Sequence, residues 1–531
     1  MSEPLPLPRG KITYSTARAE EVNILKRLQY PTEEAKFFHH IDNKRNWIKA
    51  VVAHHLKLRS PALCQVADIK SWYHGGFNVC IPVTISAWEG KEQPGQRVLI
   101  RFPLPYRVGE AFRPGNGDEK IRCEAGTYAY LQENCPEVPI PRLYGFATSD
   151  GGTFTRLQNL PFVARCFQHV RRQILFWLGR SLPTRYVRYQ GGSQISAEEG
   201  VGAGYLLIEH IEETQGEMLS KSWNEKRDNI ELRKTLFQGL SRIMINMARV
   251  PQPKIGSFII DRNGFLCLAN RPVSVEIFEL ENEEIPIDIP RDCTYSTADS
   301  YAMDIIGIHD NRLRHQPNAI KGIDDYIYQA SALTAMRTVL PSFIKRECRG
   351  PFLFTLTDLH QSNIFVDKNW NITSVVDLEW ASTRPVEMLR TPTWLTSKAC
   401  DEIAEEGQEE YAKAQADFMG IFTAEEEQTH SSDDRKPLLS AVMKQNWGKG
   451  IFWYTLALAS PTGIFRLFYK QIQPRFIIHS KDHDDFKVIM PWYWAEDFLK
   501  VGLKKMSDRE DYDIRLQREF EVATSDTIPR I

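Results

Sequence analysis

One stretch, Phe352–Trp380 (FLFTLTDLHQSNIFVDKNWNITSVVDLEW), constrains the fold of this chain more than any other. Its apolar runs Ile364–Val366 and Ile372–Val376 are separated by a short polar turn that contains asparagine. Two β-rich runs around such a turn predict a hairpin. Because a hairpin folds back on itself, Asp377 after the second strand is expected to return close to Asn363 before the first.

Oxygen-bearing side chains therefore gather at the mouth of the predicted hairpin. An Asp and an Asn held together form the kind of site that binds Mg²⁺ on a phosphate. Asp358 lies five positions before Asn363 on a polar segment and would be free to orient a hydroxyl group. For any one of these residues alone, an Asx-rich turn is the alternative. His360 is interpreted as a loop-packing residue, and Glu379 either assists a second metal ion or forms a salt bridge.

The Asp-x4-Asn spacing, the hairpin and the second Asp resemble the catalytic and metal-binding segments of kinases. The segments TDLHQSNIFVD and VVDLEWA are most similar to the aminoglycoside phosphotransferase/choline kinase-like family, in particular its large fungal-type members. The resemblance implies an α+β, protein-kinase-like fold with a small antiparallel-sheet lobe and a larger, mainly helical lobe. It also implies ATP, Mg²⁺ bound by Asn363 and Asp377, and Asp358 as the catalytic base toward a small-molecule hydroxyl acceptor.

The region before residue 103 reads as three short antiparallel strands, over Phe77–Val83, Thr84–Trp88 and Val98–Phe102. A Gly-Gly pair precedes the first strand, and glycines there let the backbone approach a ligand closely. A plain turn is the alternative for an isolated Gly-Gly pair. The order of elements resembles a kinase small lobe, which implies that the nucleotide phosphates contact Gly75, Gly76, Phe77 and Asn78.

Arg101 on the third predicted strand matches the basic residue that contacts nucleotide phosphates in the resembled family, where a lysine is usual. The helix expected over Glu119–Asn134 offers Glu124 as its ion-pair partner, with Glu119 as the fallback. A surface arginine at a strand end is the alternative.

Tyr205–Ile211 reads as an apolar strand that ends in a polar crossover. The crossover resembles the hinge whose backbone binds the adenine edge, which marks Glu209, His210 and Ile211. The predicted organisation is an N-terminal tail and helical extension over residues 1–60, a small nucleotide-binding lobe over 61–209 with an insertion at about 148–204, and a large catalytic and acceptor lobe over 210–531.

The insertion contains a basic, aromatic-rich run over residues 165–189, followed by a Gly/Ser patch interpreted as a loop. We interpret the run as a helix whose Phe167, Ile174, Leu175, Trp177 and Leu178 pack on the body of the protein. A recognition element for a nucleic acid or an anionic membrane is the alternative.

Further along the chain, helical periodicity is expected over Asn229–Arg249, Ala302–Asp310 and Ala330–Arg346, and a hairpin over residues 255–268. The acidic segment Glu276–Cys293 reads as a surface loop. The apolar tract Ile451–Phe468 is interrupted by Ser-Pro and reads as a buried helix pair, so no membrane span is expected.

Composition narrows the classes of function. The net charge of −2 lacks the basic excess that is typical of nucleic-acid-binding proteins. The nine cysteines include no C-x2-C pair, which favours reduced thiols over disulfides or a zinc site. No apolar signal core occurs near residue 1, so a cytoplasmic protein is expected. The sequence leaves the oligomeric state open.

The prediction is therefore transfer of the ATP γ-phosphoryl group to a hydroxyl. Two features also suit a pseudokinase that binds nucleotide or a partner without turnover: Leu356 stands where the family often has a histidine, and Arg101 where it usually has lysine. A binding module that uses the basic run over residues 165–189 is a third hypothesis.

Overall fold

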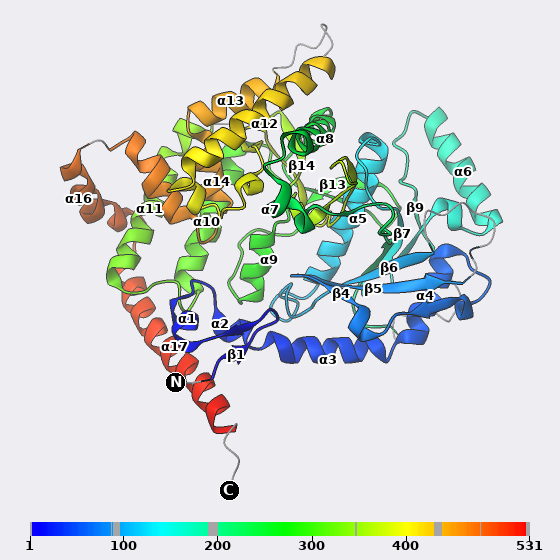
Figure 1. Ribbon diagram of the computed structural model, residues 1–531, viewed down its shortest axis with the longest axis horizontal. Coiled ribbons are helices and arrows are strands. Elements are labelled where there is room, and N and C mark those ends of the chain that lie inside the picture. The colour runs from blue at the N-terminus through cyan, green and yellow to red at the C-terminus, as the bar shows by residue number, and fades with distance from the viewer. Residues whose placement is uncertain are drawn as a thin grey trace.

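The computed structural model describes residues 3–86, 88, 96–189, 200–345, 348–429, 438–477 and 479–526. Helices and antiparallel strands are both well represented, which confirms the α+β class. The largest sheet lies at one side of the molecule, and most of the later helices lie at the other (Figure 1).

The largest sheet has eight strands in the spatial order β3-β5-β6-β10-β7-β8-β9, with β4 paired to β5. Every pair in it is antiparallel. Its strands are β3 (Cys64–Val66), β4 (Tyr73–His74), β5 (Asn78–Ile85), β6 (Arg97–Pro103), β7 (Leu143–Ala147), β8 (Thr153–Arg156), β9 (Tyr186–Arg188) and β10 (Tyr205–Glu209). The predicted strand break between Val83 and Thr84 is wrong, because both residues belong to the continuous strand β5.

Strand alternation gives the sheet two distinct faces. On one face, Val79, Ile81 and Val83 of β5 pack with Ile48 and Val51 of helix α4 (Arg45–Leu56), which follows α3 (Tyr30–Asp42). The opposite face carries Cys80 and Arg101, which are direct cross-strand partners. Arg101 is therefore directed away from the face that α4 covers.

Helix α5 (Asn116–Asn134) packs on the face that carries Arg101. Its Ile121, Ala125 and Tyr128 share a core with Leu206 and Ile208 of β10. At Gly126 the helix runs against strand β12, where an added Cβ would overlap the carbonyl group of Phe258. Glycine therefore permits the close packing of α5 against the rest of the molecule.

Three small antiparallel sheets lie beyond α5 and include the strands around residues 352–385. They are β11-β15-β16, β12-β13 and β14-β17. Their bounds are β11 (Glu217–Met218), β12 (Ser257–Ile260), β13 (Leu266–Asn270), β14 (Phe352–Leu356), β15 (Ile364–Val366), β16 (Ile372–Val375) and β17 (Ala381–Pro385). The predicted hairpins at 255–268 and 364–376 are confirmed.

Helices make up most of the remaining chain and enclose the largest hydrophobic core. They are α7 (Trp223–Lys226), α8 (Ile230–Ala248), α9 (Val275–Asn282), α10 (Ala298–His315), α11 (Ile323–Phe343), α12 (Gln408–Thr429), α13 (Leu439–Gly448), α14 (Ile451–Leu458), α15 (Ile464–Leu467), α16 (Ser480–Ile489) and α17 (Phe498–Asp526). The predicted buried helix pair at 451–468 is confirmed by α14 and α15. No helix in the described part of the chain is long and apolar enough to cross a membrane.

The N-terminal residues lie against the last helix. Strands β1 (Leu5–Pro6) and β2 (Lys11–Ile12) and helices α1 (Tyr14–Ala19) and α2 (Ile24–Arg27) precede α3. Ala17 and Ile24 pack with Tyr512, Leu516 and Phe520 of α17. The predicted extension thus has a small hydrophobic core with the C-terminal helix.

Two further predictions are wrong. The segment expected to be a surface loop after residue 276 begins with helix α9, whose Ile277 and Phe278 are buried. The helix expected to pack through its apolar residues is α6 (Phe162–Trp177), and it has no buried residue. Phe167 is 66% exposed and Trp177 77% exposed. The Gly/Ser patch that follows lies mostly outside the described residues.

Candidate functional site

The mouth of the β15–β16 hairpin brings Asp358, Asn363 and Asp377 together. Strand β14 ends just before the loop of Asp358, and β16 ends just before Asp377. The backbone N–H of Val376 donates to the Asn363 carbonyl at 2.9 Å, which closes the hairpin mouth. Asn363 Nδ2 donates to the Asp358 carbonyl at 2.9 Å and to its Oδ2 at 3.3 Å.

Asp377 has a backbone φ of 61°, in the left-handed region that residues other than glycine seldom adopt. Such backbone conformations cost free energy and cluster at functional sites. Here the conformation turns the chain from β16 toward β17 and presents the Asp377 side chain, which is 32% exposed, to the sheet above.

Arg101 connects the sheet to this hairpin. Its Nη1 donates to Glu124 Oε1 at 2.8 Å, and its Nη2 donates to Glu379 Oε2 at 2.6 Å and to Asp377. The predicted pairing of Arg101 with Glu124 is therefore present. The fallback residue Glu119 does not pair with Arg101, because it is bound by Arg271 at 2.8 Å instead.

Lys120 is a member of this cluster that sequence reasoning missed. Its side chain is fully buried and contacts both Glu379 and the Asn78 Oδ1. Asn78 Nδ2 in turn donates to Glu379 Oε2 at 2.7 Å. Lys120 precedes Glu124 by four residues on α5, and that i, i+4 spacing places both on one side of a helix. The spacing was the available signal.

The Gly-Gly turn joins β4 to β5 at the edge of the cluster. The Gly75 N–H donates to the Asn78 carbonyl at 3.0 Å, and an added Cβ on Gly75 would meet no atom within 4 Å. The Gly76 carbonyl accepts from Arg107 Nε at 2.6 Å. Phe77 packs edge-on against Trp380, with ring centroids 5.0 Å apart. Of the four residues predicted to meet phosphates, Asn78 is the one whose side chain hydrogen-bonds within the carboxylate cluster.

The predicted hinge lies farther along the sheet. Leu206 of β10 is opposite Arg101, whereas Glu209 is opposite Val98. Glu209 exchanges hydrogen bonds with Arg142, using its backbone N–H at 2.8 Å and its Oε2 at 3.0 Å. His210 is buried with its ring centroid 6.1 Å from that of Tyr73, and Ile211 is half-buried. The structure does not bring Glu209, His210 and Ile211 into contact with the carboxylate cluster.

Charge is unbalanced in the cluster. Arg101 and Lys120 contact the carboxyl groups of Glu124, Asp377 and Glu379, and Asp358 adds a fourth carboxyl group that neither cation contacts. Partial burial, followed by the fields of Asp377 and Glu379, raises the pKa of Asp358 to about 7. Burial raises the pKa of Glu124 to about 7, although Arg101 opposes the shift. Burial also acts to raise the pKa of Asp377, but Arg101 and Lys120 outweigh it and the net shift is downward.

These residues suit a hard divalent cation better than a transition metal. Among the described residues no group of three or more His, Cys, Asp or Glu side chains has the geometry of a metal site. Mg²⁺ is commonly bound by one or two side chains together with substrate phosphates and water. Asn363 directs its Nδ2 at Asp358, so its Oδ1 is the atom available to a cation beside Asp377. The excess of negative charge fits that assignment.

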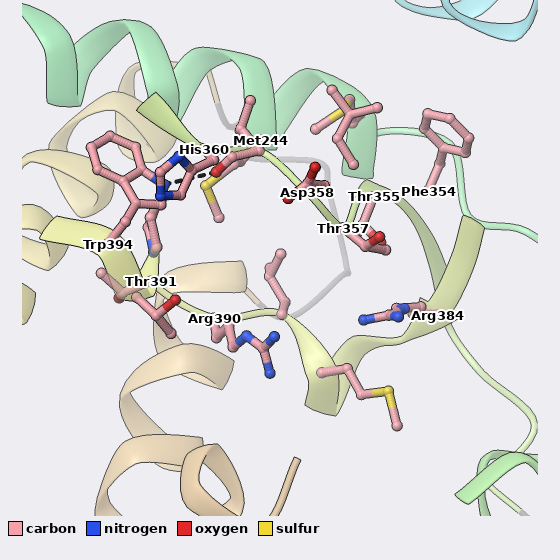
Figure 2. Close-up of a pocket in the computed structure, with 17 residues that line it drawn as sticks. Met244, Phe354, Thr355, Thr357, Asp358, His360, Arg384, Arg390, Thr391 and Trp394 are labelled. Carbon is pink, nitrogen blue, oxygen red and sulfur yellow. Dashed lines mark hydrogen bonds between the residues drawn. The ribbon is translucent and has the colours of Figure 1, made fainter. Parts of the chain in front are cut away.

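A pocket of about 170 Å³ adjoins Asp358 (Figure 2). It is bounded by α8, β14, the loop of Asp358, β17 and the chain from Met388 to Trp394. Trp394 Nε1 donates to the Leu359 carbonyl at 2.7 Å and so ties this wall to the loop. His360 caps the next turn through a 3.5 Å contact with the Ser362 N–H, in agreement with its loop-packing interpretation.

Comparisons with known proteins find only distant similarity. No family model matches the chain, and no curated protein matches it. An ethanolamine kinase from Plasmodium vivax is similar over 87% of this chain and 86% of its own, with 10% identity and a TM-score of 0.34. A macrolide 2'-phosphotransferase type I is similar over 77% of this chain and 90% of its own, with 11% identity and a TM-score of 0.28. Scores this low assign the chain to no fold or family.

Proposed function

We propose that this protein is an ATP-dependent phosphotransferase that moves the γ-phosphoryl group to a hydroxyl of a small molecule. The observation that carries the proposal is the meeting of Asp358, Asn363 and Asp377 with the Arg101–Glu124 ion pair, next to a pocket that opens at Asp358. In this proposal residues 61–209 act as a small nucleotide-binding lobe and residues 210–531 as a large acceptor lobe. The resemblance to large fungal-type aminoglycoside phosphotransferase/choline kinase-like proteins supports it.

Asn363 and Asp377 would hold Mg²⁺, which when bound neutralises charge on the β- and γ-phosphates. Arg101 and Lys120 would neutralise phosphate charge from the other side. Because Arg101 contacts Asp377 directly, binding of nucleotide with its metal would exchange that ion pair for contacts between Arg101 and phosphate. Glu124 would keep the guanidinium group in place during the exchange.

Asp358 would act as the general base. Its carboxyl lines the pocket, where an acceptor hydroxyl can approach it. A pKa of about 7 suits a base that must be ionised before reaction and must then accept a proton. The Asn363 amide, which donates to Asp358, would hold that carboxylate in position.

A pseudokinase is the second candidate, and the Arg101 contacts favour it. Arg101 already binds three carboxylates, so a metal would have to compete with it for Asp377. If that ion pair persists with nucleotide present, the protein would bind ATP or a partner without transferring phosphate.

Phosphoryl transfer tests the proposal directly. ATP consumption with Mg²⁺ is measured over a panel of hydroxyl compounds for the wild type and for Asp358→Asn. We expect Asp358→Asn to lower kcat by about 10²–10⁴-fold. Asp367→Asn, in the exposed turn of the same hairpin, is the matched control and should keep full activity. Thermal stabilisation by Mg-ATP without ATP consumption would favour the pseudokinase, and equal rates for wild type and Asp358→Asn would remove Asp358 from the mechanism.

A further inference from the structure

Two arginines line the pocket beside Asp358. Arg384 extends from β17, and Arg390 lies in the chain that follows it. In Figure 2 the two guanidinium groups lie in the lower part of the pocket, and Asp358 lies above them. No ion pair joins either arginine to a carboxylate within the described ranges.

The hydrogen bonds of these arginines are also incomplete. Arg384 Nε is buried without a hydrogen-bond partner. The guanidinium group of Arg384 hydrogen-bonds a neutral group, the hydroxyl of Tyr301. Arg390 Nη1 makes a 3.4 Å contact with the Thr455 carbonyl. Burial, followed by the field of Arg384, lowers the pKa of Arg390. Two half-buried cations that repel each other are costly unless an anion joins them.

The negative groups near this pair lie on other elements. Asp358 lines the same pocket. Less strongly than burial, the charge of Glu276 on α9 acts to raise the pKa of both Arg390 and Asp358, but Glu276 forms no ion pair with Arg390. Asp358 is assigned to the acceptor hydroxyl, so it does not serve as a permanent counter-ion. An external anion is thus the group that would complete the site.

We propose that the acceptor is an anionic hydroxyl compound, whose carboxylate or phosphate group is bound by Arg384 and Arg390 while its hydroxyl faces Asp358. Arginine matches both groups, because its planar fork can donate two parallel hydrogen bonds to carboxylate or phosphate oxygens. This substrate class rests on the proposed phosphotransfer, whereas the anion site itself can be tested without it.

Anion binding is measured by the change in tryptophan fluorescence on titration with inorganic phosphate and, separately, with acetate; Trp394 lines the pocket and is the expected reporter. We expect saturable binding of at least one anion, weakened at least about tenfold by Arg390→Gln and by Arg384→Gln. Arg233→Gln removes an arginine that is paired with Asp417 on the helical surface, and it should bind like the wild type. The stronger of the two anions identifies a phosphorylated or a carboxylated acceptor.

The outcomes separate the two proposals. No saturable binding of either anion, or equal binding in Arg390→Gln, overturns the anion site. If the variants fold poorly, phosphate should instead protect Arg390 of the wild type from phenylglyoxal, and equal labelling with and without phosphate overturns the site. Anion binding without ATP consumption would support the anion site and refute phosphotransfer. Turnover of a cationic or neutral acceptor would refute only the proposal that the acceptor is anionic.

The apolar side of helix α6 faces solvent, and this supports a second, independent inference. Its eight large apolar residues that are exposed include both ends and the middle of the helix: Phe162, Val163, Phe167, Val170, Ile174, Phe176, Trp177 and the following Leu178. The polar side faces the body instead. Arg172 donates to the carbonyls of Pro183 and Thr184, and the Arg171 guanidinium lies 5.5 Å from the centroid of the Phe265 ring.

The segment that carries α6 contains charges of one sign. Residues 151–189 include no Asp or Glu, and from Arg165 onward they contain six arginines. Arg180, Arg185 and Arg188 are exposed. Helix α6 also lies at one end of the molecule, far from α16 (Figure 1). An exposed apolar stripe with tryptophan, bordered by arginines, matches the interface of a bilayer that carries anionic lipids.

We infer that α6 docks the protein on the surface of an anionic bilayer, with Phe167, Ile174 and Trp177 in the interface and Arg180 and Arg185 near the headgroups. Flotation with vesicles of phosphatidylcholine, with or without about one-third phosphatidylserine, tests it. The wild type should float with the anionic vesicles, less so at high salt, and the double variant Phe167→Ser/Trp177→Ser should lose at least about nine-tenths of that binding.

Trp492→Ser is the matched control, because it removes another exposed tryptophan (56% exposed) and should leave flotation unchanged. Failure of the wild type to float, or equal flotation of the double variant, overturns lipid docking. A wild-type dimer in light scattering that the double variant abolishes would assign the apolar face to a second copy of the chain and overturn it as well.

Discussion

Glu119 and Glu124 belong to the same helix, α5, but to buried charge networks of different construction. Arg271 donates to Glu119 at 2.8 and 2.9 Å and to Glu281 at 2.8 and 3.0 Å, so its guanidinium group binds each carboxylate through two hydrogen bonds. Arg291 adds a bond to Glu119 at 3.1 Å, and Arg113 adds one to Glu281 at 2.7 Å. This network joins α5 to α9 and has at least as many cations as carboxylates.

The network around Glu124 is incomplete by the same measures. Arg101 Nε and Glu124 Oε2 are buried without hydrogen-bond partners, and Arg101 and Lys120 are paired with three carboxyl groups. A buried charge without compensation is destabilising. The comparison teaches that the balanced network holds the fold together, whereas the unbalanced one fits the proposal that a cation and a phosphate bind there.

The largest expected effect is on stability, from breaking the balanced network. Arg271→Met leaves Glu119 and Glu281 buried without their main partner, and we expect the free energy of unfolding to fall by about 3–5 kcal/mol. Urea denaturation measures it. Arg233→Met, which breaks a surface pair, should cost about 1 kcal/mol or less. A loss that small for Arg271→Met would mean that the two networks do not differ as described.

The next effect concerns the unbalanced network and should appear only with ligand present. Asp377→Asn removes one of the excess negative charges, so the ligand-free protein should melt within a few degrees of the wild type. Mg-ATP should raise the Tm of the wild type and leave that of Asp377→Asn unchanged, because binding stabilises only the state that binds. Asp367→Asn should respond like the wild type. Equal stabilisation of Asp377→Asn would place the metal elsewhere.

Local patterns in the sequence predicted the parts of the site that lie on neighbouring strands. Hairpin geometry is enough to bring Asp377 back to Asn363. The pairing of Arg101 with Glu124 came from the resemblance to a kinase small lobe, which left Glu119 as the fallback. Lys120 was missed because a lysine in a helix is usually solvated, and its burial depends on Glu379, which is distant in sequence. The acidic α9 was predicted to be a loop for the same reason: Glu281 is neutralised by Arg271 and Arg113 from other elements.

The orientation of α6 could not be predicted either. Amphipathic spacing shows that a helix has an apolar side, but it does not show which side meets the body. The expectation that Phe167 and Trp177 are buried rests on the usual hydrophobic driving force. The arginine contacts with Pro183, Thr184 and Phe265 reverse it, and none of these contacts has a local sequence signal.

A smaller effect is expected in the pH dependence of turnover. With the Asp358 pKa at about 7, the ionised base is the minor form below neutrality. We expect kcat/KM to be half-maximal near pH 7 and to fall about tenfold for each pH unit below it. The rates are measured with one acceptor and with Mg-ATP, both well below saturation, where kcat/KM reports the ligand-free enzyme. An acid limb centred near pH 4 would mean that burial and the neighbouring Asp377 and Glu379 do not raise the pKa of Asp358.

The smallest effect is on thermal stability. Its sign shows whether folding raises or lowers the pKa of a carboxyl group. The pKa of Asp358 is raised above its value of 3.8 in the unfolded chain, so the wild type loses stability as the pH rises from about 4 to 7. Asp358→Asn does not titrate and should therefore raise the Tm by a few degrees at pH 8 and by less at pH 5.

Asp367 is the control of opposite sign. Burial acts to raise its pKa, but hydrogen bonds from Asn371 and Asn369 outweigh it and the net shift is downward. Asp367→Asn should thus lower the Tm slightly at pH 8. A gain for Asp358→Asn that is equal at both pH values would show that folding does not raise the pKa of Asp358.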